Sequence, residues 1–260
     1  KEIMLDKKFG ASGNHVVVEE FLTGPEVSVL SFCDGKTVKP MVSSMDHKRA
    51  LDHDEGLNTG GMGTVAPNPY YTPAVAERCM QEIFLPTVAA MQAEGCPFKG
   101  CLYFGLMLTP DGPKVIEYNC RFGDPETQVV LPLLESDLLT VMEATTNGTL
   151  DKTDVKFSDG AAACVILASG GYPLAYEKGK EITGLTAGQL NAADVTVYHA
   201  GTAIKDGRLV TNGGRVLGVT ATANTLPEAL KKAYAATESI HFDKLHKRSD
   251  IGARALAAMQ

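Results

Sequence analysis

The spacing of apolar residues in the first part of the 260-residue chain predicts a strand-rich sheet. Val16 to Leu22 is a β-branched, apolar run that predicts a largely buried strand. Glu26 to Cys33 predicts a second strand, which ends at an Asp-Gly turn, and Thr37 to Ser43 predicts a third. We therefore expect a meander of neighbouring strands.

The middle of the chain combines helical patterns with a pair of strands. A helix is predicted from Thr72-Pro73 to Gly95, because apolar residues recur with helical spacing after a proline that suits a first helical turn. Pro86 predicts a kink inside it. Two strands follow at Cys101 to Leu108 and Lys114 to Asn119, and a second helix is predicted from Asp124 to about Thr146.

Polar residues without periodicity occupy 147–159 and predict a domain boundary there. Beyond it, strands are predicted at Ala161 to Ala168, Val195 to His199, Arg208 to Thr211 and Arg215 to Ala221. Asn212 to Arg215 predicts a hairpin, and a capping box that starts at Thr225 predicts a helix to about Ile240. The pattern favours an α+β fold, with a domain of residues 1–150 followed by a smaller, strand-rich α+β domain of residues 151–260.

Composition narrows the class of protein. A hydrophobic content of 44% is enough for a substantial core, and a net charge of -7 argues against a general nucleic-acid or acidic-membrane surface. No apolar run approaches the roughly 20 residues of a membrane span, and no signal peptide opens the chain. The six cysteines show no paired spacing and are predicted to be reduced thiols, so we expect a cytoplasmic protein.

A short phrase on the strand at 114–119 suggests metal chemistry. Glu117 and Asn119 are two residues apart, so their side chains project from the same side of a strand, and Arg121 continues that face if the strand persists. Mg²⁺ takes carboxylate and amide oxygens, and Arg stabilises charge on a phosphoryl group. The phrase predicts a nucleotide and metal site, although an isolated Glu-x-Asn is more often a solvated strand end.

Acidic residues at the end of the run at 16–22, and Glu26 after it, could accept hydrogen bonds from an adenine amine or from ribose hydroxyls. An ordinary strand, turn and strand with exposed Glu is the alternative. The run alone does not decide between them.

Two loop phrases have features of an anion site. Asp46 to Arg49 sets two cations beside a carboxylate, which suits a phosphate or a phosphorylated sugar, although such charged runs are usually solvated loops. Asn58 to Gly63 offers backbone N–H groups that no side chain obstructs, and it lacks the Lys-Ser/Thr ending of a P-loop. A flexible turn is the alternative reading of that phrase.

In their order and wording these phrases resemble the ATP-grasp region of the phosphoribosylamine-glycine ligase family, the glycinamide ribonucleotide synthetases. The resemblance rests on Glu19 to Leu22, Asp46 to Arg49, Asn58 to Gly63 and Glu117 to Glu126. Three later runs resemble the C-terminal domain of that family: Gly170 to Pro173, His199 to Thr202 and Thr211 to Val216. The resemblance covers essentially the whole chain and implies the C-terminal lobe of an ATP-grasp domain followed by the strand-rich C-terminal domain.

The resemblance implies an ATP-dependent carbon–nitrogen ligase of purine biosynthesis. Such an enzyme joins glycine to 5-phosphoribosylamine through glycyl phosphate and releases glycinamide ribonucleotide, ADP and phosphate, with Mg²⁺ or Mn²⁺ as the metal. The implied metal ligands are Glu117 and Asn119, and the implied catalytic residues are Arg121 and Asp124. The implied nucleotide contacts are Glu19, Glu20, Phe21, Leu22 and Glu26. The implied substrate contacts are Asp46, Lys48, Arg49, Asn58, Thr59, Gly60, Gly61 and, less directly, Arg215.

The N-terminal substrate domain and the first ATP-grasp lobe of that family have no counterpart in these residues. We therefore expect a part of a longer enzyme that needs the N-terminal part as its partner and is inactive alone. Two alternatives stay open: another ATP-grasp carboxylate–amine ligase, and a non-catalytic fragment that folds and binds nucleotide weakly. The motifs are compatible with a standalone ligase and with a multifunctional polypeptide.

Overall fold

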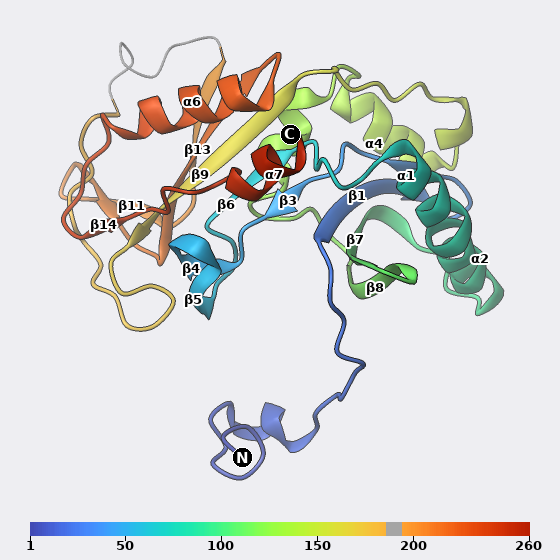
Figure 1. The fold of residues 1–260 in the computed structure, drawn as a ribbon, viewed down its shortest axis with the longest axis horizontal. Coiled ribbons are helices and arrows are strands. Elements are labelled where there is room, and N and C mark those ends of the chain that lie inside the picture. The colour runs from blue at the N-terminus through green and yellow to red at the C-terminus, as the bar shows by residue number, and fades with distance from the viewer. Residues whose placement is uncertain (186–193) are drawn as a thin grey trace.

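The computed structural model describes residues 1–185 and 194–260, which form two main sheets with helices packed around them (Figure 1). The first is a four-stranded antiparallel sheet with the order β2-β1-β7-β8. Its strands are β1 (Glu26–Asp34), β2 (Val38–Pro40), β7 (Lys99–Thr109) and β8 (Gly112–Asn119). All four strands were predicted, with small differences at their ends.

Two helices cover one face of this sheet. α1 (Pro73–Cys79) and α2 (Leu85–Ala93) bury the side of the sheet that carries Val29 and Phe104. The predicted helix start is confirmed, because the Thr72 side chain accepts a hydrogen bond from Val75 N at 3.4 Å. The irregularity predicted near Pro86 is a π-helical segment, η3 (Met80–Phe84), between the two helices.

The second sheet is larger and has the order β10-β13-β9-β6-β3, with β14 paired to β9. Its strands are β3 (Met45–Asp46), β6 (Gly63–Ala66), β9 (Ala161–Ser169), β10 (Val195–His199), β13 (Arg215–Ala223) and β14 (Leu245–His246). β9 is buried along its whole length and packs against α6 (Leu226–Thr237) and α3 (Thr127–Val130). Because β6 pairs with β9, segments on both sides of residue 150 share this sheet.

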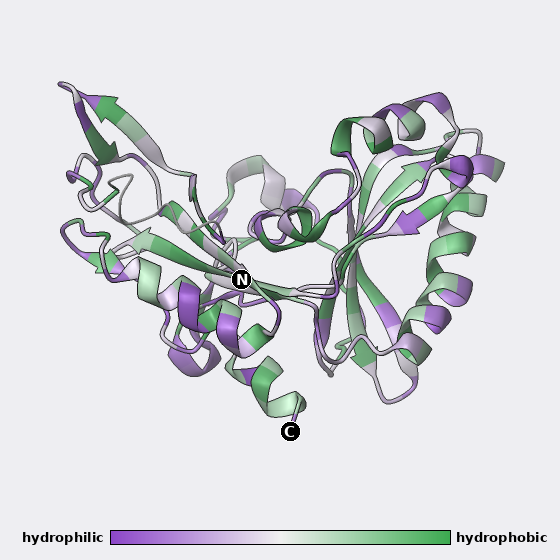
Figure 2. Cartoon of the chain, turned by 90° about the horizontal axis from the view of Figure 1, so that it is seen from above, coloured by the Kyte–Doolittle hydropathy of each residue, from purple (hydrophilic) through white to green (hydrophobic). Residues whose placement is uncertain are grey.

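Two short strand pairs and several short helical segments complete the fold. The pairs are β4 (Arg49–Leu51) with β5 (Glu55–Asn58) and β11 (Thr202–Lys205) with β12 (Arg208–Thr211). The remaining helices are α4 (Leu138–Asn147) and α7 (Ala253–Ala258). The 3-10 segments are η1 (Gly10–Asn14), η2 (Asp52–Asp54), η4 (Leu131–Leu133) and η5 (Leu150–Lys152). Figure 2 shows hydrophobic residues along the strands of both main sheets.

The predicted strand at Val16 to Leu22 is wrong. Residues 15–23 belong to no strand, and the side chains of Val17 and Val18 are 85% and 90% exposed. The first residues of the chain extend away from the rest of the molecule (Figure 1). A strand requires a neighbour to pair with its backbone, and residues 1–185 and 194–260 supply none for this run.

The predicted hairpin at Asn212 to Arg215 is also wrong. β12 pairs with β11, whereas β13 pairs with β9 and β10, so the turn carries the chain from one sheet to another. Asn212 N donates to Gly201 O at 2.7 Å, and a Cβ on Gly213 would lie 2.8 Å from Gly201 Cα. The two glycines allow this close crossing of backbones.

The long helix predicted from Asp124 to about Thr146 is interrupted. α3 ends at Val130, and η4, which contains Pro132, follows it. Asp137 then begins α4 by accepting a hydrogen bond from Thr140 N at 2.7 Å. A proline that cannot donate and a strong N-cap residue together explain the break.

Two predictions about the chain as a whole can be compared with the structure. All six cysteines are free thiols, which confirms the prediction from their spacing. Among the described residues no helix is both long and apolar enough to cross a membrane.

Candidate functional site

The predicted metal residues lie together on β8. Asn119 Nδ2 donates to Glu117 Oε1 at 3.1 Å, so the two side chains share one face of the strand. Ile116 is an extra residue on β8, at the point where its register against β7 shifts next to Gly105. Such a bulge redirects a neighbouring side chain. A Cβ on Gly105 would lie 3.0 Å from Glu117 Cγ, so the glycine leaves room for this carboxylate.

Arg121 lies just past the end of β8 and does not join this pair. The strand ends at Asn119, so the alternation that would place Arg121 on the same face does not continue. Its Nη1 donates to Phe122 O at 2.9 Å, and its side chain is exposed.

The residues predicted to contact a nucleotide line one cavity of about 340 Å³. The cavity is lined by Glu19, Glu20, Phe21, Leu22, Glu26, Met107, Lys114, Val115 and Ile116. The ion pair between Glu20 and Lys114, at 2.8 Å, ties the N-terminal segment (residues 16–22) to β8. Because the Phe21 side chain is 90% exposed, the described residues enclose the cavity from one side only.

A second cavity, of about 420 Å³, adjoins the first and shares Glu26 and Ile116 with it. Its other lining residues are Gly24, Asp46, Lys48, Arg49, Asp54, Asn58 and Arg254. Lys48 Nζ lies 2.6 Å from Glu26 Oε2. Burial lowers the pKa of Lys48, but its hydrogen bond and ion pair with Glu26 outweigh that effect and raise the pKa. Lys48 therefore stays charged where the two cavities meet.

Buried carboxyl groups lie behind the second cavity. Burial, together with the nearby Glu126 carboxyl, raises the pKa of Asp46 well above its usual range. Burial also raises the pKa of Glu126, whose Oε1 accepts a hydrogen bond from Tyr103 OH at 3.2 Å. Two carboxyl groups in one buried region resist ionising together. Asp46 is thus suited to holding a proton beside the cavity.

The glycine loop is held by side chains from the second half of the chain. Gly60 N donates to Tyr172 OH at 2.9 Å, and Arg215 Nη1 donates to Gly60 O at 2.7 Å. Arg215 Nη1 also donates to Asp124 O at 2.8 Å, and its Nη2 lies 3.3 Å from Asp124 Oδ2. Arg215 thus connects the glycine loop with Asp124, two sites that the sequence predicted separately.

The rest of this loop is organised locally. Thr59 Oγ1 donates to Lys48 O at 2.9 Å and accepts from Gly61 N at 2.9 Å. Gly61 has a φ of +113°, and a Cβ there would lie 2.6 Å from Asp46 Oδ1. Only glycine fits this position. The N–H groups of Gly60 and Gly61, which were predicted to be available to an anion, both have protein partners here.

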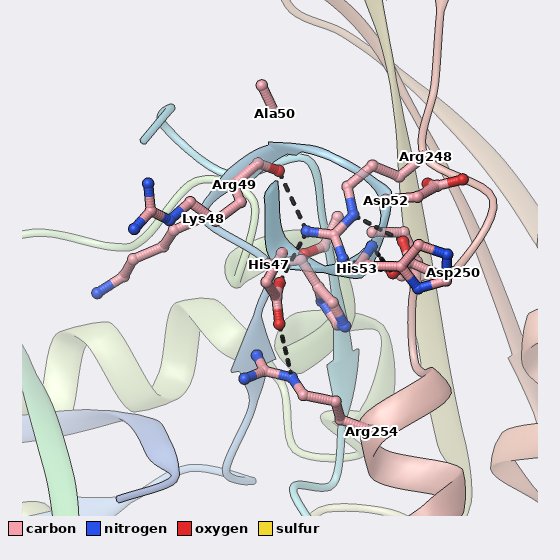
Figure 3. A network of polar contacts seen from close by, with 12 residues as sticks. His47, Lys48, Arg49, Ala50, Asp52, His53, Arg248, Asp250 and Arg254 are labelled. Atoms are coloured by element: carbon pink, nitrogen blue, oxygen red, sulfur yellow. Dashed lines mark hydrogen bonds and ion pairs between the residues drawn. The ribbon is translucent and has the colours of Figure 1, made fainter. Parts of the chain in front are cut away.

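A buried network holds residues 46–58, which we call the clamped loop (Figure 3). His47 Nδ1 lies 3.1 Å from Gly63 O, and Gly252 N donates to His47 Nε2 at 3.0 Å. These partners require a neutral ring with its proton on Nδ1. Burial, followed by the charge of Arg248, lowers the pKa of His47 to about 4.

Arg248 is the centre of the network, and its side chain is only 1% exposed. Its Nε and Nη2 donate to the two carboxylate oxygens of Asp250 at 2.7 and 2.8 Å. Its Nη1 donates to Asp54 Oδ1 at 3.0 Å and to Arg49 O at 3.1 Å. Ser249 N also donates to Asp52 Oδ1 at 2.8 Å. The C-terminal residues therefore fix the backbone of the clamped loop.

The sequence analysis missed Tyr172, Arg248, Asp250 and Arg254 as parts of this region. Tyr172 stood inside a recognised run without a role. The other three form the pattern Arg-x-Asp, then Gly-x-Arg, near the end of the chain, which is a local signal of alternating charge. Their partners lie about 200 positions earlier, and a local pattern cannot name them.

A larger cavity than these two lies elsewhere. It measures about 1040 Å³ and is lined by residues of α6 and of the turn before β9. It contains none of the residues predicted for the site. The chemistry of the smaller cavities, rather than size, identifies the candidate site.

Comparison with known proteins agrees with this arrangement. Residues 1–127 match the family model of the phosphoribosylglycinamide synthetase ATP-grasp (A) domain, and residues 162–254 match that of its C domain. The chain is 49% identical to phosphoribosylamine-glycine ligase of Vibrio vulnificus over 100% of this chain and 60% of that protein. It is 51% identical to the trifunctional purine biosynthetic protein adenosine-3 of Gallus gallus, over 98% of this chain and 25% of that protein.

Solved structures give the same family. The crystal structure of phosphoribosylamine-glycine ligase from Thermotoga maritima superimposes with a TM-score of 0.80 and 39% identity, over 90% of this chain and 57% of that one. Biotin carboxylase of Campylobacter jejuni, at a TM-score of 0.63 and 13% identity, shares the fold alone. These matches confirm the predicted α+β ATP-grasp architecture. With two family models matched along most of its length, the chain belongs to the phosphoribosylglycinamide synthetase family.

Proposed function

We propose that this chain supplies the C-terminal ATP-grasp lobe and the C-terminal domain of an ATP-dependent ligase that joins glycine to 5-phosphoribosylamine in purine biosynthesis. The main observation behind this proposal is that two adjoining cavities share Glu26 and Ile116. Ile116 comes directly before Glu117 on β8. One cavity suits a nucleotide and the other suits a phosphorylated amine. The names of the Vibrio and Thermotoga ligases support this choice of substrates.

Within this function, the two parts of the chain have separate roles. We assign residues 1–150 to the ATP-grasp lobe and residues 151–260 to the C-terminal domain, and we expect the protein in the cytoplasm. The Tyr172 and Arg215 contacts with Gly60 support a role of the second part in holding the first.

The side chains on β8 fit a divalent metal. Glu117 and Asn119 present a carboxylate and an amide on one face, and rotating the Asn119 amide would turn its oxygen toward the same point. Mg²⁺ or Mn²⁺ held there would neutralise charge on the phosphates of ATP. Arg121, at the strand end, has donors to spare for a transferring phosphoryl group. Asp124, which Arg215 holds, lies on the same connection.

The proposed reaction has two steps. An oxygen of the glycine carboxylate attacks the terminal phosphorus of ATP, an O–P bond forms, the bond to ADP breaks, and glycyl phosphate results. The amine of phosphoribosylamine then attacks the carbonyl carbon, a C–N bond forms, the bond to phosphate breaks, and the nitrogen loses a proton. Lys48, between the two cavities, would stabilise the negative charge in both steps.

The chain spans 60% of the length of the Vibrio ligase, and the described residues close the nucleotide cavity from one side only. We therefore propose that turnover requires the N-terminal part found in the longer relatives. Catalysis of phosphoryl transfer depends on enclosing and orienting both reactants, which a half-open cavity does not achieve.

The test is ADP release in the presence of glycine and phosphoribosylamine. We would assay the 260-residue chain alone, the N-terminal part of the Vibrio ligase alone, and the two fused. We expect turnover only in the fusion, and a loss of about 100-fold or more after Glu117→Gln, because one ligand to the metal is removed.

Three outcomes would contradict the proposal. Turnover of the chain alone would refute the need for a second part. ADP release that follows another carboxylic acid instead of glycine would indicate a different ATP-grasp ligase. A folded fusion that binds ATP without turnover would indicate a non-catalytic protein.

A further inference from the structure

Arg254, on α7 at the end of the chain, reaches the same cavity as Arg49 of the clamped loop. No sequence motif singled it out. Its side chain is 54% exposed, and its Nε lies 3.3 Å from Asp54 Oδ2. Two guanidinium groups from opposite ends of the chain therefore converge on one cavity.

The charges around this cavity are unevenly matched. Lys48 is paired with Glu26. Asp54 is shared between Arg254 and the buried Arg248, and Arg248 is also held by Asp250. In residues 1–185 and 194–260 no carboxylate pairs with Arg49, whose Nη1 donates only to Gly56 O at 2.7 Å. Arg49 thus lines the cavity without a carboxylate partner of its own among the described residues.

The guanidinium groups of Arg254 and Arg49 also have N–H donors that bind no described protein acceptor. Arg254 uses its Nε for Asp54, and Arg49 uses one Nη1 donor for a backbone carbonyl. Each guanidinium has five N–H donors in a planar fork that matches the oxygens of a phosphate. The remaining donors are available for a tetrahedral anion in the cavity.

The buried network fixes both groups before any ligand arrives. Arg248 holds the carbonyl of Arg49 and the carboxylate of Asp54, and Asp54 holds Arg254. Gly252, the residue before α7, donates to buried His47. Preorganised donors lose little entropy on binding, so this arrangement favours a ligand that needs both groups.

We propose that Arg254 and Arg49 form the subsite for the phosphate ester of the sugar phosphate substrate. This inference rests on the proposed function, which supplies an amino sugar with one phosphate ester as the second substrate. The sugar then extends from this subsite toward Lys48 and Glu26, where the second cavity meets the first. Arg254 thus carries a contact from the C-terminal domain to the substrate.

The test is calorimetric titration of the 260-residue chain with ribose 5-phosphate at low salt. We expect ribose 5-phosphate to bind and ribose not to bind. Arg254→Ala is expected to weaken binding about 10-fold or more, because a charge-assisted pair of hydrogen bonds is lost. Arg254→Lys is expected to restore part of the affinity, since lysine keeps the charge but not the fork.

Arg208 provides the matched control. It is an exposed arginine whose Nη1 lies 3.2 Å from Glu181, and it does not line the second cavity. Arg208→Ala should bind ribose 5-phosphate as the parent chain does. Thermal unfolding of each variant would confirm an unchanged fold, and inorganic phosphate titrated alone would show whether a free anion is preferred to the ester.

Several outcomes would overturn the subsite. These are unchanged affinity in Arg254→Ala, tighter binding of inorganic phosphate than of the ester, and no binding of ribose 5-phosphate by a chain that binds ATP. The activity of the fusion separates this inference from the function. If the folded fusion does not release ADP with glycine and phosphoribosylamine but ribose 5-phosphate binds in an Arg254-dependent way, the proposed function fails and the subsite stands.

Discussion

The clamped loop and the N-terminal segment both carry residues predicted for the site, yet the rest of the chain holds them very differently. The clamped loop is joined to the C-terminal residues by the buried Arg248, by His47 and by Asp52. Within the described part of the chain the N-terminal segment has one ion pair, between Glu20 and Lys114, and most of its apolar side chains are exposed.

The comparison shows that hydrophobicity did not decide which segment became ordered against the core. The N-terminal segment is the more apolar of the two, whereas the clamped loop is rich in charge. The charged segment is the one anchored to the rest of the chain, although most of its residues are exposed, because its polar groups find partners, chiefly Arg248 and Asp250. A buried polar group is tolerated when it is satisfied, and an apolar strand forms only when a neighbour pairs with it.

The largest expected effect comes from breaking the clamp at its centre. Arg248→Ala leaves Asp250 and Asp54 without their buried partner, and removing one member of a buried ion pair typically costs about 3–5 kcal/mol. Urea unfolding of the chain would measure the loss. Arg208→Ala, which removes an exposed pair, should change the free energy of unfolding by less than about 1 kcal/mol. If both variants lost the same free energy of unfolding, Arg248 would be no more important for stability than an exposed ion pair.

A second effect should appear on lowering the pH. The pKa of His47 is about 4 in the folded chain against 6.5 for an ordinary histidine, so the unfolded chain takes up its proton first as pH falls. The contribution of His47 to stability is therefore complete above about pH 6.5 and is lost progressively toward pH 4. Between pH 7 and pH 5 it should account for about 2 kcal/mol of the free energy of unfolding.

His47→Gln provides the comparison for this effect. Glutamine cannot titrate, so the variant should lose less stability than the parent chain between the same two pH values. The acidic groups with raised pKa values, Asp46 and Glu126, have the opposite pH dependence and are present in both proteins. The difference between the two slopes therefore isolates the histidine. Parallel slopes would contradict a buried, neutral His47.

The smallest effect is expected in the N-terminal segment. Phe21→Ala should alter the free energy of unfolding by no more than about 0.5 kcal/mol, because the ring is 90% exposed and loses no packing. Phe32→Ala is the matched variant. Its ring is 2% exposed on β1, and its loss should cost about 3–5 kcal/mol. A large effect of Phe21→Ala in this chain would show that the N-terminal segment is packed in solution.

The sequence predicted the parts of the fold that depend on neighbours in the chain. The strands of the four-stranded sheet and the helix start at Thr72 followed from local spacing and capping, and the Glu117 and Asn119 pair followed from the alternation of a strand. The predicted hairpin at Asn212 failed because β13 pairs with β9, which lies far earlier in the chain. Local turn chemistry cannot report which distant strand offers the better partner.

The same limit applies to the site. The runs at Asp46 and Asn58 were found because they are local phrases, and they line or border the second cavity. Arg248 and Arg254 were missed because their link to the site comes from partners about 200 residues away, Arg49 and Asp54. Arg215 was predicted as a phosphate contact, and the structure adds its bonds to Gly60 and Asp124, which link two parts of the site.

The pairing of β6 with β9 has a consequence for how the two parts of the chain can be cleaved or exchanged in evolution. Its pairs, from Gly63 with Val165 to Ala66 with Ala162, cross from the segment matched by one family model to the segment matched by the other. A protease that cleaved the polar stretch at 147–159 would leave the two pieces joined by the hydrogen bonds between β6 and β9. Likewise, a recombination event that exchanged the C domain for that of a distant relative would have to carry a compatible β6, so the two parts are expected to have diverged together.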